Sequence, residues 1–174
     1  MQESKTLNYY DEKTQEFIES TVNVDFQETQ DKFLKLLAPQ AHILDFGCGS
    51  GRDAKYFLEQ GFQVTAIDGS AELCKFASAL TGIEVKQMFF QELSKIEAYD
   101  GIWACSSILH LPYGELEDVF LKMVKAVKNG GVIYTSFKYG SFEGYRNERY
   151  CTDTDEAKFA EFVNGYPDID IEEL

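Results

Sequence analysis

Several features that define other classes of protein are missing from this sequence. No apolar run approaches the ~20 residues that a helix needs to cross a bilayer, and residues 1–5 are too polar to open a signal peptide. The four cysteines form no C-x-x-C pair, and none stands at zinc-finger spacing from either of the two histidines. We therefore expect a reduced, cytoplasmic protein with no metal site and no membrane association.

Basic residues are also scarce. The chain has 16 lysines and arginines against 30 aspartates and glutamates, a formal net charge of −14. A surface of this sign repels phosphate backbones and anionic lipid headgroups, so nucleic acid is not expected as a partner. The remaining composition is that of a packed globular fold, because 174 residues with 44% hydrophobic content suit one domain with one sizeable core.

Short apolar segments alternate with helical segments along the chain. The β-branched run at residues 62–67 is typical of a strand, and Ser70 is placed to cap a helix that Gly82 ends. The N-terminal region predicts helix over residues 9–37, and another helix is expected to end at Asn129-Gly130-Gly131. Strands are expected at residues 42–46, 62–67, 83–88, 100–105 and 132–137, the third of them near a sheet edge.

This alternation predicts an α/β fold: a Rossmann-like, doubly wound, mostly parallel sheet with helices on both faces. We expect a single domain over residues 1–174, with a helical cap at 1–40, a core at 41–138 and a substrate-side loop, helix and terminal strand at 139–174. Ligands of such sheets bind at the carboxyl ends of the strands. Candidate site residues should therefore follow the expected strands directly.

The turn after the first expected strand carries glycines at positions 47, 49 and 51. A dinucleotide fingerprint needs a further glycine where this chain has Arg52, so pyrophosphate binding by a nicotinamide enzyme is disfavoured. A phosphate P-loop is excluded as well, because no Gly-Lys-Ser/Thr follows. Asp45, just before the turn, argues further against an anionic ligand, and Asp68 after the second strand can accept from both hydroxyls of a ribose.

These residues resemble the class I S-adenosylmethionine-dependent methyltransferases over roughly residues 8–138. Residues 44–51 are similar to the first motif of that family, residues 64–70 to its ribose-binding segment and residues 90–93 to its adenine loop. Residues 100–111 resemble the fourth-strand motif, and residues 128–133 resemble the turn into the fifth strand. The narrower likeness is to small bacterial methyltransferases of the type 11/12, tellurite-resistance-like kind, which act on small molecules.

The resemblance implies S-adenosylmethionine as the cofactor and assigns roles around it. The glycine turn would line the methionine portion, Asp45 would help to hold its amino end, and Asp68 would bind the ribose. Tyr10 would close over the cofactor or else pack in the core, and Arg52 would neutralise the cofactor's carboxylate or else be solvated. The full set of expected cofactor-binding residues is Tyr10, Asp45, Gly47, Cys48, Gly49, Gly51, Arg52, Asp68, Gly69, Ser70, Gln91, Glu92, Leu93 and Ser106.

The methyl acceptor is less well defined by the sequence. His110 follows the fourth strand and titrates near neutrality, so it is the candidate general base, with a structural histidine as the alternative. Tyr113, Tyr139 and Arg146 lie on expected loops and are candidates for the wall of a small-molecule acceptor pocket. A non-catalytic subunit that binds the cofactor without turning it over remains a second interpretation.

The C-terminal segment predicts a helix over residues 155–164 and one strand over residues 168–174. Class I folds usually finish with a two-stranded antiparallel hairpin, so the hairpin is expected to be incomplete here. One side of the fifth strand would then be exposed to a second copy, and we expect a monomer or a weak homodimer.

Overall fold

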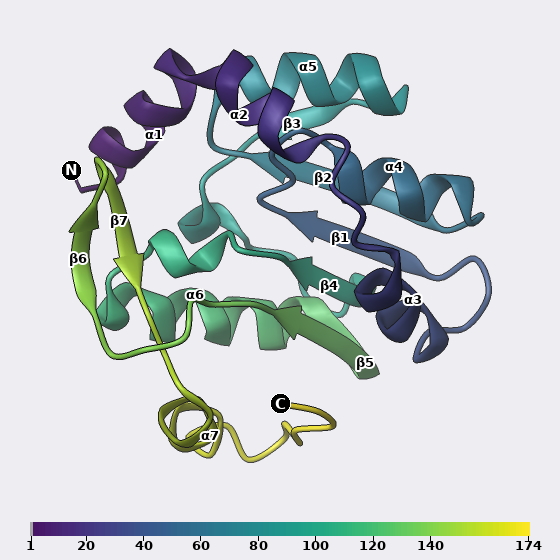
Figure 1. Cartoon of the computed structure of the whole chain (residues 1–174). Helices are drawn as coiled ribbons and strands as arrows, with labels where there is room; N and C mark the ends of the chain where they lie inside the picture. The colour runs from purple at the N-terminus through teal and green to yellow at the C-terminus, as the bar shows by residue number, and fades with distance from the viewer. Residues whose placement is uncertain (1) are drawn as a thin grey trace.

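A five-stranded parallel sheet lies at the centre of the computed structural model, which describes residues 2–174 (Figure 1). Its strand order is β3-β2-β1-β4-β5, so the order reverses between β1 and β4, where such sheets open a ligand crevice. This arrangement confirms the predicted Rossmann-like fold and the edge position of β3. The strands are β1 (His42–Phe46), β2 (Gln63–Asp68), β3 (Val85–Gln87), β4 (Tyr99–Ala104) and β5 (Val127–Thr135).

Helices cover both faces of the sheet, because alternate side chains of the central strands are apolar on each side. On one face, Ile43 and Trp103 pack against Phe33 and Phe57, which belong to α3 (Gln27–Lys35) and α4 (Arg52–Glu59). α5 (Ala71–Thr81) packs on the same side through Ala77. The opposite face is covered by α6 (Tyr113–Ala126). None of the helices within residues 2–174 is long and apolar enough to cross a membrane.

The N-terminal region consists of three helices rather than the one continuous helix expected over residues 9–37. α1 (Gln2–Glu12) and α2 (Thr14–Thr21) precede α3. The Asp25 side chain accepts the backbone N–H of Gln27 at 3.1 Å. This local hydrogen bond favours a new helix that begins at Gln27 over the continuation of a longer helix. The break leaves α1 beside α5 at the top of the molecule, while α3 lies against the sheet face (Figure 1).

No strand of the described residues pairs with the outer side of β5, so the hairpin expected there is incomplete, as predicted, and a small antiparallel hairpin stands apart from the main sheet. β6 (Glu143–Arg146) pairs with β7 (Arg149–Thr152) in an antiparallel sheet of its own beside α1 (Figure 1). Asn147 and Glu148 form its two-residue turn with φ of 48° and 66°, as a type I′ turn requires. This segment was expected to be loop.

Two boundary expectations were wrong. Residues 168–174 do not form a strand, because after α7 (Glu156–Val163) the chain runs irregularly across the surface. α6 ends at Ala126 rather than at the glycines, and the segment that holds Gly130 and Gly131 forms an irregularity in β5, where the pairing register with β4 shifts. The helix expected over residues 155–164 is confirmed, and the Asp155 carboxylate caps it by accepting the Lys158 N–H at 2.8 Å.

Candidate functional site

A cavity of about 390 Å³ opens at the carboxyl ends of the strands. Its floor is the turn after β1 and the end of β2, and its walls come from the loops after β3, β4 and β5, with α1, α2 and β7 closing it from above. The cavity therefore lies at the switch point that the strand order defines. The sequence-predicted residues that line it are Tyr10, Gly47, Cys48, Gly49, Arg52, Asp68, Gly69, Ser106 and His110.

The glycines of the turn have left-handed backbone conformations, and neighbouring side chains leave little or no room for a Cβ atom at these positions. Gly47 has a φ of +86°, and a Cβ there would lie 2.5 Å from the Cβ of Ser107. A Cβ on Gly49 would lie 3.1 Å from the Phe17 ring. Gly51 does not line the cavity, because it packs against α5, where a Cβ would meet the Cβ of Ala77 at 3.0 Å. Gly51 thus allows the close helix packing that the third fingerprint glycine supplies in dinucleotide folds.

Asp68 ends β2 with its carboxylate facing the cavity. One oxygen accepts the Gly49 N–H at 2.8 Å, and the other accepts the Ser70 N–H at 2.9 Å. Burial raises the pKa of this carboxyl, and the two backbone donors oppose that rise. Since each carboxylate oxygen accepts more than one hydrogen bond, Asp68 can still receive a pair of ligand hydroxyls.

Asp45 lies in the sheet beneath the turn and is not among the cavity-lining residues. Its side chain is 2% exposed, and burial, followed by the charges of Asp53 and Asp68, raises its pKa well above the ordinary value. One of its oxygens has no hydrogen-bond partner among the described residues. The expected role of Asp45 at the amino end of a cofactor therefore stays a prediction.

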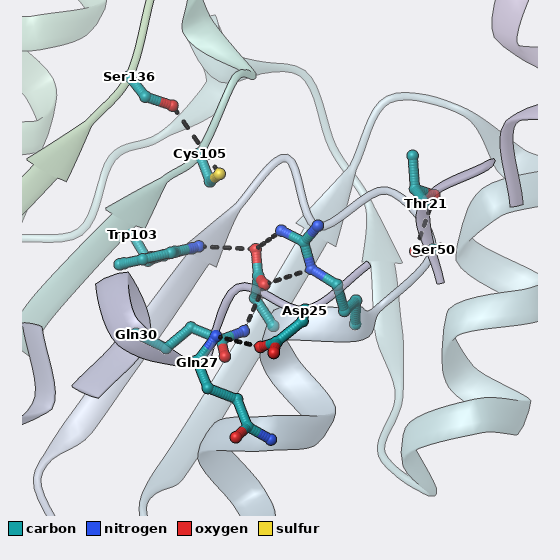
Figure 2. A network of polar contacts seen from close by, with 10 residues as sticks. Thr21, Asp25, Gln27, Gln30, Ser50, Trp103, Cys105 and Ser136 are labelled. Atoms are coloured by element: carbon teal, nitrogen blue, oxygen red, sulfur yellow. Dashed lines mark hydrogen bonds and ion pairs between the residues drawn. The ribbon is translucent and has the colours of Figure 1, made fainter. Parts of the chain in front are cut away.

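A buried polar network, in which Figure 2 labels Gln30 and Trp103, supports one wall of the cavity. The Asp53 side chain joins these residues. Its carboxylate accepts the Gln30 amide at 2.6 Å and the Trp103 indole N–H at 2.9 Å. Arg52 adds bonds of 2.7 and 3.0 Å to the two oxygens. The charge of Arg52 is thus matched by its neighbour's carboxylate, and its expected role toward the carboxylate of a cofactor stays a prediction.

The opposite wall is joined to α1 by a chain of hydrogen bonds through His110. The Tyr150 carbonyl oxygen lies 2.6 Å from Nδ1 of His110, and since a carbonyl only accepts, Nδ1 carries the proton. Nε2 therefore accepts from the Tyr10 hydroxyl, 2.8 Å away, and the Tyr10 oxygen in turn accepts from Arg149. Burial, together with the charges of Arg149 and Lys138, lowers the pKa of His110 to about 4, so the imidazole is neutral.

Sequence reasoning missed several residues of this site. Met88 and Phe89 line the cavity from the loop after β3, just before the segment 90–93 that the resemblance implied, and within that segment Phe90 lines it although only Gln91, Glu92 and Leu93 were predicted as site residues. Lys138 and Arg149 also line it, and they reach it from the segment after β5 and from the unpredicted hairpin. The aromatic pattern at 89–90 was a usable signal for the former, whereas no local motif marked the two cations.

The other predicted residues do not line the cavity, and most have visible structural partners. Ser70 caps α5, Glu92 accepts the Phe89 N–H, and Leu93 is buried in the core. Gln91 donates to Glu115 at 3.0 Å. The three acceptor candidates lie elsewhere: Tyr113 contacts Phe162, Tyr139 is exposed, and Arg146 pairs with Asp153 at 2.8 Å.

Cys48 and Cys105 both line the cavity as protonated thiols. Burial raises the pKa of Cys48 well above its ordinary value and that of Cys105 to about 11. Thiols that stay protonated at neutral pH are poor nucleophiles and poor metal ligands. Within residues 2–174, no group of three or more histidine, cysteine, aspartate or glutamate side chains is arranged to hold a metal ion.

The matching family model and two curated relatives of this chain are all described as methyltransferases. The family model described as "Methyltransferase domain" matches residues 43–131. The chain is 28% identical over 134 residues to the malonyl-[acyl-carrier protein] O-methyltransferase of Salmonella typhimurium, a match that covers 73% of this chain and 52% of that protein. It is 33% identical over 99 residues to a ubiquinone biosynthesis O-methyltransferase of Rickettsia akari, covering 54% of this chain and 39% of the relative. The chain thus spans about half the length, or less, of these relatives.

A solved structure shares the fold over nearly the whole chain. It is the 1,6-didemethyltoxoflavin-N1-methyltransferase of Burkholderia thailandensis, determined with 1,6-didemethyltoxoflavin and S-adenosylhomocysteine bound. The TM-score is 0.76 at 19% identity, and the match covers 93% of this chain and 76% of that structure. At this identity, the likeness establishes the architecture.

Proposed function

This chain belongs to the methyltransferase domain family, and we propose that it binds S-adenosylmethionine in the cavity and transfers the methyl group to a small-molecule acceptor. The observation that carries the proposal is the position of Asp68, a carboxylate at the end of β2 that faces the cavity next to the glycine turn. The family assignment, the turn and Asp68 agree on a nucleoside cofactor at one place in the fold.

The residues around the cavity fit such a cofactor. The turn approaches it with backbone rather than side chains, because Cβ atoms on Gly47 and Gly49 would fill the space. Asp68 is placed to accept from ribose hydroxyls, and Phe89 and Phe90 offer apolar surface to a base. S-adenosylmethionine supplies a methyl group on a positively charged sulfur, which suits a site whose floor carries a carboxylate.

Several observations support a small acceptor containing oxygen. The cavity of about 390 Å³ lies within the size range of small-molecule sites and is partly covered by α1 and α2. The net charge of −14 disfavours nucleic acid. Both curated relatives described above are named as O-methyltransferases, which supports oxygen as the acceptor atom.

We assign His110 to positioning rather than to proton abstraction. Its Nδ1 proton is committed to the Tyr150 carbonyl, its Nε2 lone pair is taken by the Tyr10 hydroxyl, and its pKa of about 4 makes it a weak base. In this arrangement the residues of the cavity align the acceptor, exclude water and provide no unengaged histidine base. This replaces the sequence-based proposal of His110 as general base.

Calorimetric titration with S-adenosylhomocysteine tests the cofactor site. Asp68→Ala should weaken binding by about 1–3 kcal/mol, because ribose hydroxyls would lose a buried charged acceptor. Binding should also weaken as the pH falls through the pKa of Asp68, which burial raises, since hydroxyl donors favour the ionised form. Asp118→Ala on the exposed face of α6 is the matched control and should leave affinity unchanged.

Unchanged affinity in Asp68→Ala would refute the ribose role. Formation of S-adenosylhomocysteine from S-adenosylmethionine over a panel of oxygen-bearing metabolites then separates an enzyme from a non-catalytic binding subunit. Binding without turnover across the whole panel would favour the subunit.

A further inference from the structure

The cavity carries two cations that have no carboxylate partner among the described residues, although the chain as a whole is strongly acidic. Lys138 and Arg149 both line it. Arg149 lies over the Tyr9 ring at 4.8 Å and bonds to Tyr10, yet its Nε is buried with no hydrogen-bond partner among the described residues. The described residues therefore satisfy the Arg149 guanidinium only in part, which costs free energy.

The acidic side chains that line the cavity form no ion pair with these cations. The Asp68 carboxylate accepts two backbone N–H groups at the turn, and Asp53 is paired with Arg52. Lys138 and Arg149 instead lie close enough to His110 for both charges to lower its pKa. Charge in the cavity is therefore divided, with the carboxylates on the side of the glycine turn and unpaired cations on the side of His110.

We propose that Lys138 and Arg149 bind the methyl acceptor through an oxyanion, a carboxylate or a phosphonate that is already ionised at neutral pH. This inference rests on the proposed function and defines the substrate class of the same site. Arg149 offers its guanidinium as a charged donor at the cavity wall, and Lys138 adds a second, exposed charge.

The engagement of both His110 ring nitrogens supports the same class of acceptor. A neutral hydroxyl or amide must lose a proton when it is methylated, and His110 is not available to take it. An oxyanion needs no base: its lone pair forms the new O–C bond, the C–S bond breaks with its electrons going to sulfur, and no proton is released. One negative and one positive charge disappear together, so a carboxylate leaves a neutral ester, a phosphonate dianion leaves an ester with one negative charge, and the sulfonium becomes a thioether.

The two cations could instead hold the carboxylate of the cofactor, and the test must separate these cases. Protein saturated with S-adenosylhomocysteine is titrated with sodium acetate and, separately, with methylphosphonate, at an ionic strength held constant with sodium chloride. The Nε–H NMR signal of Arg149, identified by its loss in Arg149→Lys, reports on the unpartnered donor. We expect a saturable shift with one or both anions and none with acetamide, the neutral counterpart of acetate.

Lys138→Gln should weaken anion binding at least threefold, whereas Lys128→Gln should not. Lys128 lies at the other end of β5, paired with Asp100, and serves as the matched control. Affinity for S-adenosylhomocysteine should stay within twofold in Lys138→Gln. Signals that move no more than with chloride, or an anion affinity unchanged in Lys138→Gln, would overturn the proposal.

A tenfold loss of S-adenosylhomocysteine affinity in Lys138→Gln would also overturn it, by assigning this cation to the cofactor. Failure of the proposed function gives a different result, since the wild-type protein would then not bind S-adenosylhomocysteine at all. The response of the two probes decides whether the carboxylate or the phosphonate is preferred.

Discussion

The two sides of the cavity are built in opposite ways. The turn side, Gly47–Gly49 with Asp68, uses backbone groups and a carboxylate that lie within about twenty positions along the chain. The opposite side, called the lid side here, is formed by Tyr10, His110, Arg149 and Tyr150. Its hydrogen bonds join residues far apart in sequence, since Tyr10 and His110 are 100 positions apart and His110 and Tyr150 are 40 apart. The turn side is thus set by the sheet itself, whereas the lid side exists only when α1 and the hairpin are docked.

The largest effect should come from the turn side. In Gly47→Ala, the new Cβ would lie 2.5 Å from the Cβ of Ser107, whose hydroxyl is tied to the Phe46 carbonyl at 2.6 Å. We expect a loss of about 3 kcal/mol or more in unfolding free energy, from overpacking added to a left-handed alanine. Urea denaturation measures it.

Gly61→Ala is the matched control for this substitution. Gly61 has the same φ of +86°, but a Cβ there meets nothing within 4 Å. The control should therefore lose only about 1 kcal/mol, the conformational part. Equal losses in the two variants would show that close approach at the turn contributes nothing to its rigidity.

The lid side should instead make the free energy of unfolding depend on pH. His110 has a folded-state pKa of about 4 against an ordinary value of 6.5, so the unfolded chain binds a proton that the folded protein excludes. The stability that this provides is complete above pH 6.5 and is lost as the pH falls toward 4. Between pH 7.5 and 5, wild type should lose about 2 kcal/mol more than His110→Gln.

Urea midpoints at the two pH values test this expectation, with His42→Gln as the control. His42 also has a lowered pKa, but it starts β1 at the far end of the sheet and is only half-buried. Its substitution should change the pH dependence much less. Parallel pH profiles for wild type and His110→Gln would mean that the lid side does not exclude the proton.

The same contrast explains which parts could be predicted from sequence. The strands, the glycine turn and Asp68 were predictable, because each depends on residues that are near one another in the chain and on a periodicity that the sheet imposes. The hairpin was missed, because Asn147-Glu148 is a weak signal for a turn that needs two positive φ angles. Without the hairpin, neither Arg149 nor the partner of His110 could be placed.

Tertiary packing also explains why several residues predicted for the site do not line the cavity. Gln91, Glu92 and Leu93 follow β3 in sequence, but the short helix η1 (Phe90–Glu92) turns Leu93 into the core and presents Phe90 to the cavity. Tyr139 and Arg146 were expected at the acceptor pocket because their segment was interpreted as loop. The direction of a side chain beyond a strand end depends on what packs against it, and local sequence does not record that.

The smallest effect should come from the hydroxyl that fastens the lid. Tyr10→Phe keeps the ring contact with Phe17 at 5.1 Å but removes the donor to His110 and the acceptor for Arg149. We expect the free energy of local opening of α1 to be about 1 kcal/mol lower in this variant than in wild type. Native-state hydrogen exchange of the α1 amides should therefore be about fivefold faster.

Tyr56→Phe is the matched control. It removes a hydroxyl that bonds Asp31 at 2.6 Å outside the cavity, and it should leave hydrogen exchange in α1 unchanged. Amides of β1 should exchange at wild-type rates in both variants, because the turn side does not depend on the lid. If the α1 amides exchange equally slowly in Tyr10→Phe and wild type, apolar packing alone holds α1 over the cavity. The two sides of the cavity would then differ in where they lie, but not in a dependence of the lid side on long-range hydrogen bonds.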